Sequence, residues 1–348
     1  MQATQQQVPT RIVVLDGATL NPGYSAGQSC GDNPWDEIAA LGELSVHDRT
    51  PAACVLERAA GAAVLLVNKT RLEAAVIRAL PQLRLIAVTA TGTDVVDVQA
   101  AADCGVVVCN VAQYASDSVA QHVFALLLEI TNAVGEHSRS VREGRWQRSP
   151  DFCYWIRPTI ELAGKTLGLV GHGRIGARVG EIGHALGMDV MASSLSRSRP
   201  ALYPSFRWES VEQVFAEADV VSLHCPLTRE NAGFVGAALL ASMKPHSILI
   251  NTSRGALVDE HALAGALACG RPAAAALDVL SVEPPIDDNP LLAAPEAVIT
   301  PHMAWSTLAA RRRLMRESAA NVAAFLAGRP RNVVTSAERI GVTTANGR

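Results

Sequence analysis

Short apolar runs alternate along the chain with alanine-rich stretches that have the spacing of amphipathic helices. This alternation is typical of an α/β fold, in which parallel sheets are covered by helices on both faces. The first set of runs predicts one open sheet and occupies residues 11–16, 44–48, 62–67, 83–89 and 106–110. The second set predicts a six-stranded sheet of the dinucleotide-binding kind and occupies residues 166–170, 189–193, 219–225, 247–253, 274–279 and 297–301.

Two long helices are predicted in addition to those between the strands. An apolar helix over residues 118–134 separates the two sets, and another helix over 308–327 follows the last strand. The second helix carries four arginines, which are Arg311, Arg312, Arg313 and Arg316. Because a charge cluster on a helix is usually a solvated face, we expect these arginines at the surface.

The composition is that of a globular protein long enough for two domains, with 348 residues, 49% hydrophobic and 18% charged. A net charge of -3 makes nucleic acid an unsuitable partner. No apolar run reaches the ~20 residues of a membrane span or resembles a signal peptide, so we expect a cytoplasmic protein. The seven cysteines contain no CxxC pair, which argues against disulfides and a metal site and predicts that most of them fill the core.

The strongest local motif is GHGRIG at residues 171–176, which directly follows an apolar strand and opens a helical run through Gly187. Gly171 would permit a tight turn, Gly173 would let a pyrophosphate approach the backbone, and Gly176 would let the helix close on the strand. Arg174 adds a positive charge beside the phosphates, and Ile175 completes the motif. An ordinary glycine turn is the alternative, but the strand before the motif and the helix after it favour a dinucleotide site.

The end of the next strand lacks the acid that normally binds the adenosine ribose of NAD. Ser194 occupies that position, and Arg197 and Arg199 follow it. Two arginines and no carboxylate are suited to the 2′-phosphate of NADP, so NADP(H) is expected to be tolerated or preferred. The alternative is an exposed basic loop without a ligand.

Three ionisable residues follow different strands of the second sheet, where ligands of such sheets bind. Arg254 lies in NTSRG, Glu283 in ALDVLSVEPP and His302 in AVITPH. Each has an ordinary structural explanation: a solvated arginine, a turn, and a structural histidine. Taken together beside a dinucleotide motif, they predict catalysis.

The chain resembles the D-2-hydroxyacid dehydrogenases through GHGRIG, INTSRG, ALDVLSVEPP and TPHMAW. Within this family it most resembles the glycerate dehydrogenases, or hydroxypyruvate reductases, through VTATGTDVVD, NVAQYASDSVAQHVFALLLE, GRWQRSPDFC, SLHCPLT and the Glu-Pro-Pro segment. The resemblance covers nearly the whole chain. It implies two doubly wound domains with an active-site cleft between them and a homodimer. The substrate domain would comprise residues 1–115 and 306–348, and the NAD(P)-binding domain residues 116–305.

The roles of the three ionisable residues follow from the reduction of a 2-keto acid, which needs a hydride on the carbonyl carbon and a proton on its oxygen. An imidazole has an ordinary pKa of about 6.5, so His302 suits the proton transfer. A carboxylate such as Glu283 would favour the protonated ring and fix its orientation. The planar fork of Arg254 would hold the substrate and polarise its carbonyl.

Other substrate contacts are predicted at a strand end of the first sheet. Ala90, Thr91 and Gly92 form a small-residue loop whose amides can face a carboxylate, although a plain glycine turn is the alternative. Lys69 is a further candidate for the same pocket. Trp305 could close one end of the pocket, or it could simply pack.

The resemblance also implies further cofactor contacts. Asp278 would bind the nicotinamide carboxamide, with a buried aspartate that caps a loop as the alternative. The segment from His224 through Cys225 and Pro226 would pass the adenosine. The remaining contacts would come from Thr252, Ser253, Arg254 and His302.

Several functions share these features. The expected one is hydroxypyruvate or glyoxylate reduction, and D-lactate or phosphoglycerate dehydrogenases are the substrate variants. A nucleotide-sensing corepressor of the same fold is an alternative from another class. Formate oxidation is disfavoured because it transfers a hydride without a proton donor, which leaves Glu283 and His302 without a task.

Overall fold

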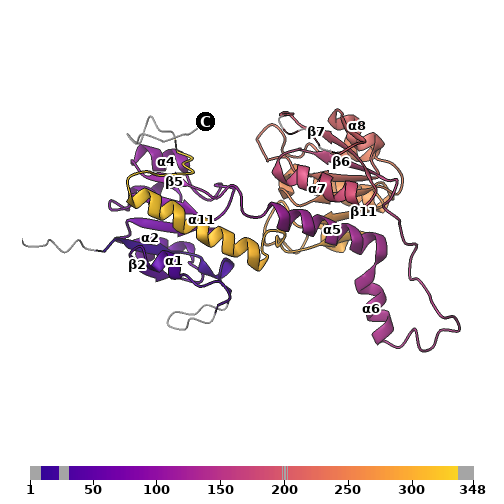
Figure 1. The fold of residues 1–348 in the computed structure, drawn as a ribbon, viewed down its shortest axis with the longest axis horizontal. Coiled ribbons are helices and arrows are strands. Elements are labelled where there is room, and N and C mark those ends of the chain that lie inside the picture. Colours follow the sequence, from indigo (N-terminus) through magenta and orange to yellow (C-terminus); the bar gives the residue numbers. More distant parts are fainter. Residues whose placement is uncertain (1–8, 23–30, 198, 200, 202, 336–348) are drawn as a thin grey trace, which may run out of the picture. The chain divides into compact units, whose positions relative to one another are not determined.

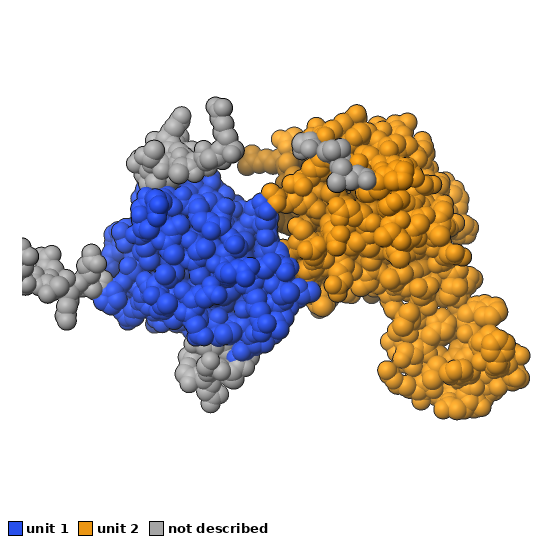
Figure 2. All heavy atoms as spheres, in the orientation of Figure 1, with its two compact units in different colours: residues 1–114, 306–348 blue, residues 115–305 orange. Residues whose placement is uncertain are grey.

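The computed structural model describes residues 9–22, 31–197, 199, 201 and 203–335. The chain divides into two compact units, which we describe separately (Figure 2). Unit 1 comprises residues 1–114 and 306–348, and unit 2 comprises residues 115–305.

Unit 1 is a five-stranded parallel sheet with the strand order β2-β1-β3-β4-β5. The strands are β1 (Arg11–Val14), β2 (Glu43–Val46), β3 (Val64–Val67), β4 (Leu85–Val88) and β5 (Val107–Cys109). The helices are α1 (Asp36–Ala39), α2 (Val55–Ala59), α3 (Ala74–Arg78), α4 (Val98–Asp103) and α11 (Leu308–Leu326). Every residue of β3 and β4 is buried, which explains their continuous apolar sequence. The five predicted strands and the predicted C-terminal helix are confirmed.

The arginines of α11 do not all face solvent. Arg312 and Arg316 are exposed as predicted, but the prediction is wrong for Arg311, which is only 7% exposed. Its guanidinium donates to both carboxylate oxygens of Asp32, and this hydrogen bond with Arg311 lowers the pKa of the Asp32 carboxyl. Arg313 donates from Nε to the carbonyl of Tyr114 at 2.8 Å. Two arginines of the cluster therefore attach α11 to other parts of unit 1 instead of forming a solvated face.

Unit 2 is a seven-stranded parallel sheet with the order β12-β11-β10-β9-β6-β7-β8. Its strands are β6 (Thr166–Val170), β7 (Asp189–Ser193), β8 (Phe206–Trp208), β9 (Val220–Leu223), β10 (Ile248–Asn251), β11 (Ala274–Leu277) and β12 (Ala297–Ile299). The order reverses between β6 and β9, as in doubly wound dinucleotide-binding sheets. Six strands were expected, and this number was wrong. The additional strand is the edge strand β8, whose three residues are too short an apolar run to predict a strand.

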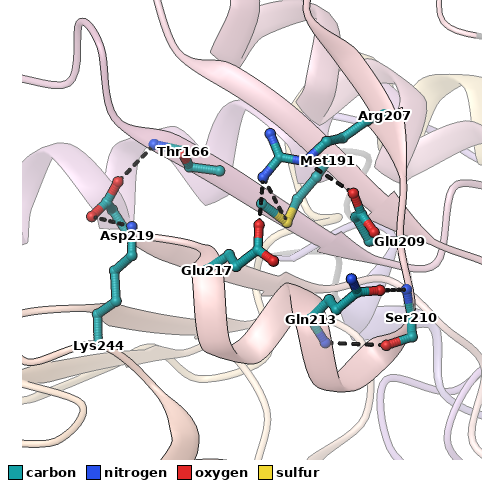
Figure 3. Close-up of polar contacts among 9 residues, drawn as sticks. All are labelled: Thr166, Met191, Arg207, Glu209, Ser210, Gln213, Glu217, Asp219 and Lys244. Atoms are coloured by element: carbon teal, nitrogen blue, oxygen red, sulfur yellow. Dashed lines mark hydrogen bonds and ion pairs between the residues drawn. The ribbon is translucent and has the colours of Figure 1, made fainter.

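Polar contacts hold β8 and the helix after it in place (Figure 3). Arg207 of β8 donates from Nε to Glu209 at 3.1 Å and from Nη2 to Glu217 at 2.9 Å. Ser210 and Gln213 form a reciprocal capping box at the start of α8 (Val211–Glu217). The chain therefore turns directly from the edge strand into a capped helix.

Helices cover both faces of the unit 2 sheet. On one face lie α5 (Ser116–Asn132) and α7 (Arg174–Ala185), and their core includes Phe124, Leu167 and Ile250. On the other face lie α8, α9 (Ala237–Ser242) and α10 (Glu260–Ala268), whose core includes Phe215 and Leu249. Successive residues of β10 thus point to opposite faces, as expected for a strand buried on both sides.

The remaining helix of unit 2, α6 (Val134–Arg142), projects from the sheet together with the segment that follows it (Figure 1). Three aromatic side chains of that segment are largely exposed, with Trp146 at 52%, Phe152 at 89% and Trp155 at 66%. Exposed aromatic residues gathered in one segment are typical of an interaction surface.

The cysteines do not occupy the core as expected. Among those in the described residues, Cys109 is buried, Cys54 and Cys225 are partly buried, and the other three are exposed. Burial raises the pKa of the Cys109 thiol to about 12. Within the same part of the chain, none of the helices is long and apolar enough to cross a membrane.

Candidate active site

Three neighbouring strands of unit 2 end at the predicted catalytic residues. Arg254 follows β10, Glu283 follows β11 and His302 follows β12, and these strands are adjacent and parallel. The structure brings two of the three into direct contact, with His302 Nδ1 2.6 Å from Glu283 Oε2. Both side chains remain partly exposed, at 27% and 34%. A charge-assisted contact of this length fixes one ring nitrogen and leaves Nε2 for another partner.

The loop that carries His302 is held by a buried carboxylate. Asp278 accepts hydrogen bonds from the amides of Met303 at 2.9 Å and Ala304 at 2.8 Å, and from the Thr300 hydroxyl at 2.6 Å. His302 itself has a φ of 52°, and its amide donates to the Asp278 carbonyl at 2.8 Å. Left-handed backbone at a residue other than glycine is strained, so these bonds are needed to maintain the conformation.

Asp278 thus caps the loop, which is one of the two roles considered from the sequence. The other role, a contact with the nicotinamide carboxamide, stays a prediction. Burial pushes the pKa of this carboxyl upward, but hydrogen bonds from His122, Thr300 and the two amides outweigh burial and lower it. His122 of α5 lies 3.0 Å from the Thr300 hydroxyl and 3.4 Å from Asp278. Sequence reasoning missed His122, although a histidine in an apolar helix was a signal.

Arg254 begins the turn after β10. Its carbonyl accepts from the Asn251 side chain at 2.8 Å, and its Nη1 donates to the Ser253 carbonyl at 2.8 Å. The next residue, Gly255, packs directly on the loop after β11, because a Cβ there would lie 1.9 Å from the carbonyl carbon of Leu280. The turn of Arg254 and the loop of Glu283 are therefore in backbone contact.

The glycine motif after β6 has the shape of a pyrophosphate cradle. Gly171 has a φ of 101°, and a Cβ at Gly176 would lie 2.1 Å from the Gly171 carbonyl oxygen. A Cβ at Gly173 would meet nothing within 4 Å, so this glycine faces open space. The helix α7 begins next at Arg174 without a side-chain cap, and the amides of its first turn can bind an anion. The residues present therefore fit a dinucleotide, and Ile175 packs against the core below them.

The segment after β9 forms a wall beside this cradle. A Cβ at Gly171 would lie 2.6 Å from both the His224 carbonyl carbon and the Cys225 amide nitrogen. Burial, together with the neighbouring His172, lowers the pKa of His224 to about 3, so the ring is neutral at working pH. Ser253 donates to the Cys225 carbonyl at 2.6 Å, and Pro226 is exposed. These contacts place the loops after β9 and β10 side by side.

Thr252 offers a polar group that the described residues do not satisfy. Its Oγ1 is buried and has no hydrogen-bond partner in that part of the chain. Because a buried hydroxyl usually has a partner, this atom is suited to a bound ligand beside Ser253. The cofactor contact of Thr252 stays a prediction.

The loop after β7 carries the residues predicted to select the cofactor. The Ser194 hydroxyl donates to the Ser196 carbonyl at 2.9 Å. The guanidinium carbon of Arg197 lies 5.6 Å from the ring centre of Trp208, within the range of a cation–π contact. Arg199 is exposed, and residues 198 and 200 lie outside the described residues. The contact with the Trp208 ring of β8 holds the Arg197 side chain in one position, and the sequence did not predict this contact.

The predicted substrate residues of unit 1 follow β3 and β4. The Thr91 hydroxyl donates to the Val111 carbonyl at 3.0 Å, which braces the loop formed by Ala90, Thr91 and Gly92. The amide of Lys69 donates to Asp16, and both residues line a pocket of about 350 Å³. Trp305 belongs to unit 2 and is half-buried.

Several known proteins are similar to this chain along most of its length. The family model of the D-isomer specific 2-hydroxyacid dehydrogenase NAD binding domain matches residues 124–304. A hydroxypyruvate reductase of Blautia hydrogenotrophica is 42% identical over 327 residues, which cover 93% of this chain and 99% of the relative. The chain belongs to the D-2-hydroxyacid dehydrogenase family.

Other members of the D-2-hydroxyacid dehydrogenase family agree with this assignment. A glycerate dehydrogenase of Methylorubrum extorquens is 41% identical over 80% of this chain and 88% of its own length. The crystal structure of the TT0316 protein from Thermus thermophilus has a TM-score of 0.80 and 35% identity, and the match covers 93% of this chain and 100% of that one. The family and the fold predicted from the motifs are confirmed.

Proposed function

We propose that this dehydrogenase reduces hydroxypyruvate and glyoxylate with a nicotinamide cofactor and oxidises D-glycerate in reverse. The 2.6 Å contact between His302 and Glu283 supports this function most directly, because it lies at the carboxyl edge of a sheet with a dinucleotide cradle. A relative named hydroxypyruvate reductase, 42% identical along 93% of the chain, supports the choice of substrate. D-Lactate and phosphoglycerate are the substrate variants that the assay must separate.

His302 is the proposed acid and base of the reaction. When bound, the nicotinamide supplies a hydride to the carbonyl carbon. His302 donates a proton from Nε2 to the carbonyl oxygen, and Glu283 holds Nδ1 and stabilises the positive ring before the transfer. The ring is neutral after reduction and accepts a proton when the reaction runs in reverse.

Arg254 is the proposed electrophile. Its guanidinium presents several donors in one plane, which suits a carboxylate or a carbonyl oxygen on which negative charge develops. The loop amides of Ala90, Thr91 and Gly92 are proposed to bind the substrate carboxylate, together with the side chain of Lys69. Trp305 is proposed to limit the substrate to small side chains.

The cofactor is proposed to be NADPH as well as NADH. The Arg197→Ala variant should raise the KM for NADPH about tenfold and leave the KM for NADH unchanged, because only NADPH carries the 2′-phosphate. Steady-state rates at 340 nm with each cofactor measure both constants. The exposed Arg78 at the end of α3 provides a matched control as Arg78→Ala. An unchanged KM for NADPH in Arg197→Ala would show that the loop after β7 does not bind the phosphate.

We also propose a cytoplasmic homodimer, in which a second copy covers the exposed aromatic side chains Trp146, Phe152 and Trp155.

A panel of keto acids tests the proposed function. Rates of NADH and NADPH oxidation are compared for hydroxypyruvate, glyoxylate, pyruvate and phosphohydroxypyruvate, and we expect the highest kcat/KM for hydroxypyruvate or glyoxylate. Much better reduction of pyruvate or of the phosphorylated acid would refute the substrate assignment. Cofactor binding without turnover of any acid would indicate a nucleotide sensor instead.

A further inference from the structure

The loop that carries Glu283 has little support from burial. All residues from Ser281 through Asp288 are exposed, and the loop returns to the core only at Asn289 and Leu291. An exposed loop of this length would move freely unless polar contacts held it. The contact between Glu283 and His302 requires the loop to stay in one place. The hydrogen bonds that hold the loop are therefore relevant to the proposed reaction.

Glu260 provides these anchors. It is the first residue of α10, and its two carboxylate oxygens reach both ends of the loop. Oε1 accepts from the Ser281 amide at 2.6 Å, while Oε2 accepts from the Ser281 hydroxyl at 2.8 Å and from Asn289 Nδ2 at 2.9 Å. Hydrogen bonds to an ionised carboxylate are stronger than neutral ones. One side chain thus joins the beginning and the end of the exposed loop.

Two further contacts relay this anchoring to Glu283. The amide of Leu280, directly before Ser281, donates to Glu283 Oε1 at 3.2 Å, while Oε2 contacts His302. On its other side, the Leu280–Ser281 backbone packs against Gly255, where no side chain fits. The backbone position at Leu280 and Ser281 therefore determines where the Glu283 carboxylate lies.

We propose that Glu260 is a positioning residue for catalysis, which acts by holding the Glu283 carboxylate against His302. Glu260 itself is proposed to touch none of the reacting atoms. The inference rests on the proposed function, because it assigns the effect of Glu260 to the Glu283–His302 pair.

A double-mutant cycle tests this proposal. The Glu260→Ala variant should lower kcat for hydroxypyruvate reduction about tenfold and leave the Kd for NADH unchanged, because Glu283 is then in place only part of the time. In a Glu283→Gln background the same substitution should have no further effect on kcat. A general structural role would instead lower kcat by the same factor in both backgrounds, which would overturn the proposal.

Two more variants keep the test decisive. Ser281→Ala removes only the hydrogen bond from the Ser281 hydroxyl to Glu260, so it should lower kcat by a smaller factor than Glu260→Ala. This loss should again appear only when Glu283 is present. Ser281→Ala takes the place of Glu260→Ala if the Glu260 variant does not fold. Glu217→Ala is the matched control and should keep the wild-type kcat, because Glu217 also accepts a hydrogen bond at an exposed site of unit 2 but is far from this loop in sequence. Wild-type kcat in Glu283→Gln would refute the proposed role of the pair itself, a failure distinct from that of Glu260.

Discussion

Replacing His302 by asparagine should lower kcat for keto acid reduction about 10²- to 10⁴-fold, the usual contribution of a general acid. Asparagine keeps a polar side chain at the loop but cannot donate a proton at neutral pH. It also tolerates the left-handed backbone that His302 adopts with a φ of 52°, so the loop should keep its shape. Steady-state kinetics give kcat, and fluorescence titration gives the Kd for NADH, which should not change.

The control for this substitution is His246→Asn, because His246 is exposed and, like His302, has a positive φ, at 68°. It should leave kcat unchanged. If His302→Asn retained most of its kcat, another group would have to supply the proton, and the proposed role of the Glu283–His302 pair would be wrong.

The Arg254→Lys variant should lose about 10²- to 10³-fold in kcat/KM for hydroxypyruvate, although the positive charge is kept. Lysine presents a point charge and cannot form the two parallel hydrogen bonds of a guanidinium. Since Arg254 is proposed to bind both the ground state and the developing charge, KM should rise and kcat should fall. Initial rates over a range of hydroxypyruvate concentrations separate the two constants.

Arg312→Lys is the matched control, because Arg312 is exposed on α11 of unit 1. It should behave as the wild type. A loss confined to KM would show that Arg254 contributes uniform binding only, and full activity of Arg254→Lys would refute its role as an electrophile.

The sequence predicted much of the fold because buried parallel strands are continuous apolar runs. Both sheets were expected from such runs, and all the predicted strands are present. The edge strand β8 was missed since only Phe206, Arg207 and Trp208 form it, and contacts of Arg207 with Glu209 and Glu217 help to place it. Short strands held by side-chain contacts leave no periodic signal.

The candidate site was predictable in part. Strand ends place Arg254, Glu283 and His302 at one edge, because the carboxyl ends of parallel strands share that edge. The supporting contacts were not predictable, since the loop partners of Glu260 and His122 lie 21 and 178 residues away in sequence. Arg311 was misjudged for the same reason: its partner Asp32 is far away along the chain.

The imidazole of His302 is proposed to move the proton in both directions of the reaction. The most direct test is the pH dependence of kcat/KM for hydroxypyruvate reduction and for D-glycerate oxidation, measured on the same enzyme. Reduction needs the protonated ring, so its rate should fall as pH rises, whereas oxidation needs the neutral ring, so its rate should rise through the same pH range. The same trend in both directions, or unchanged profiles in His302→Asn, would contradict the account.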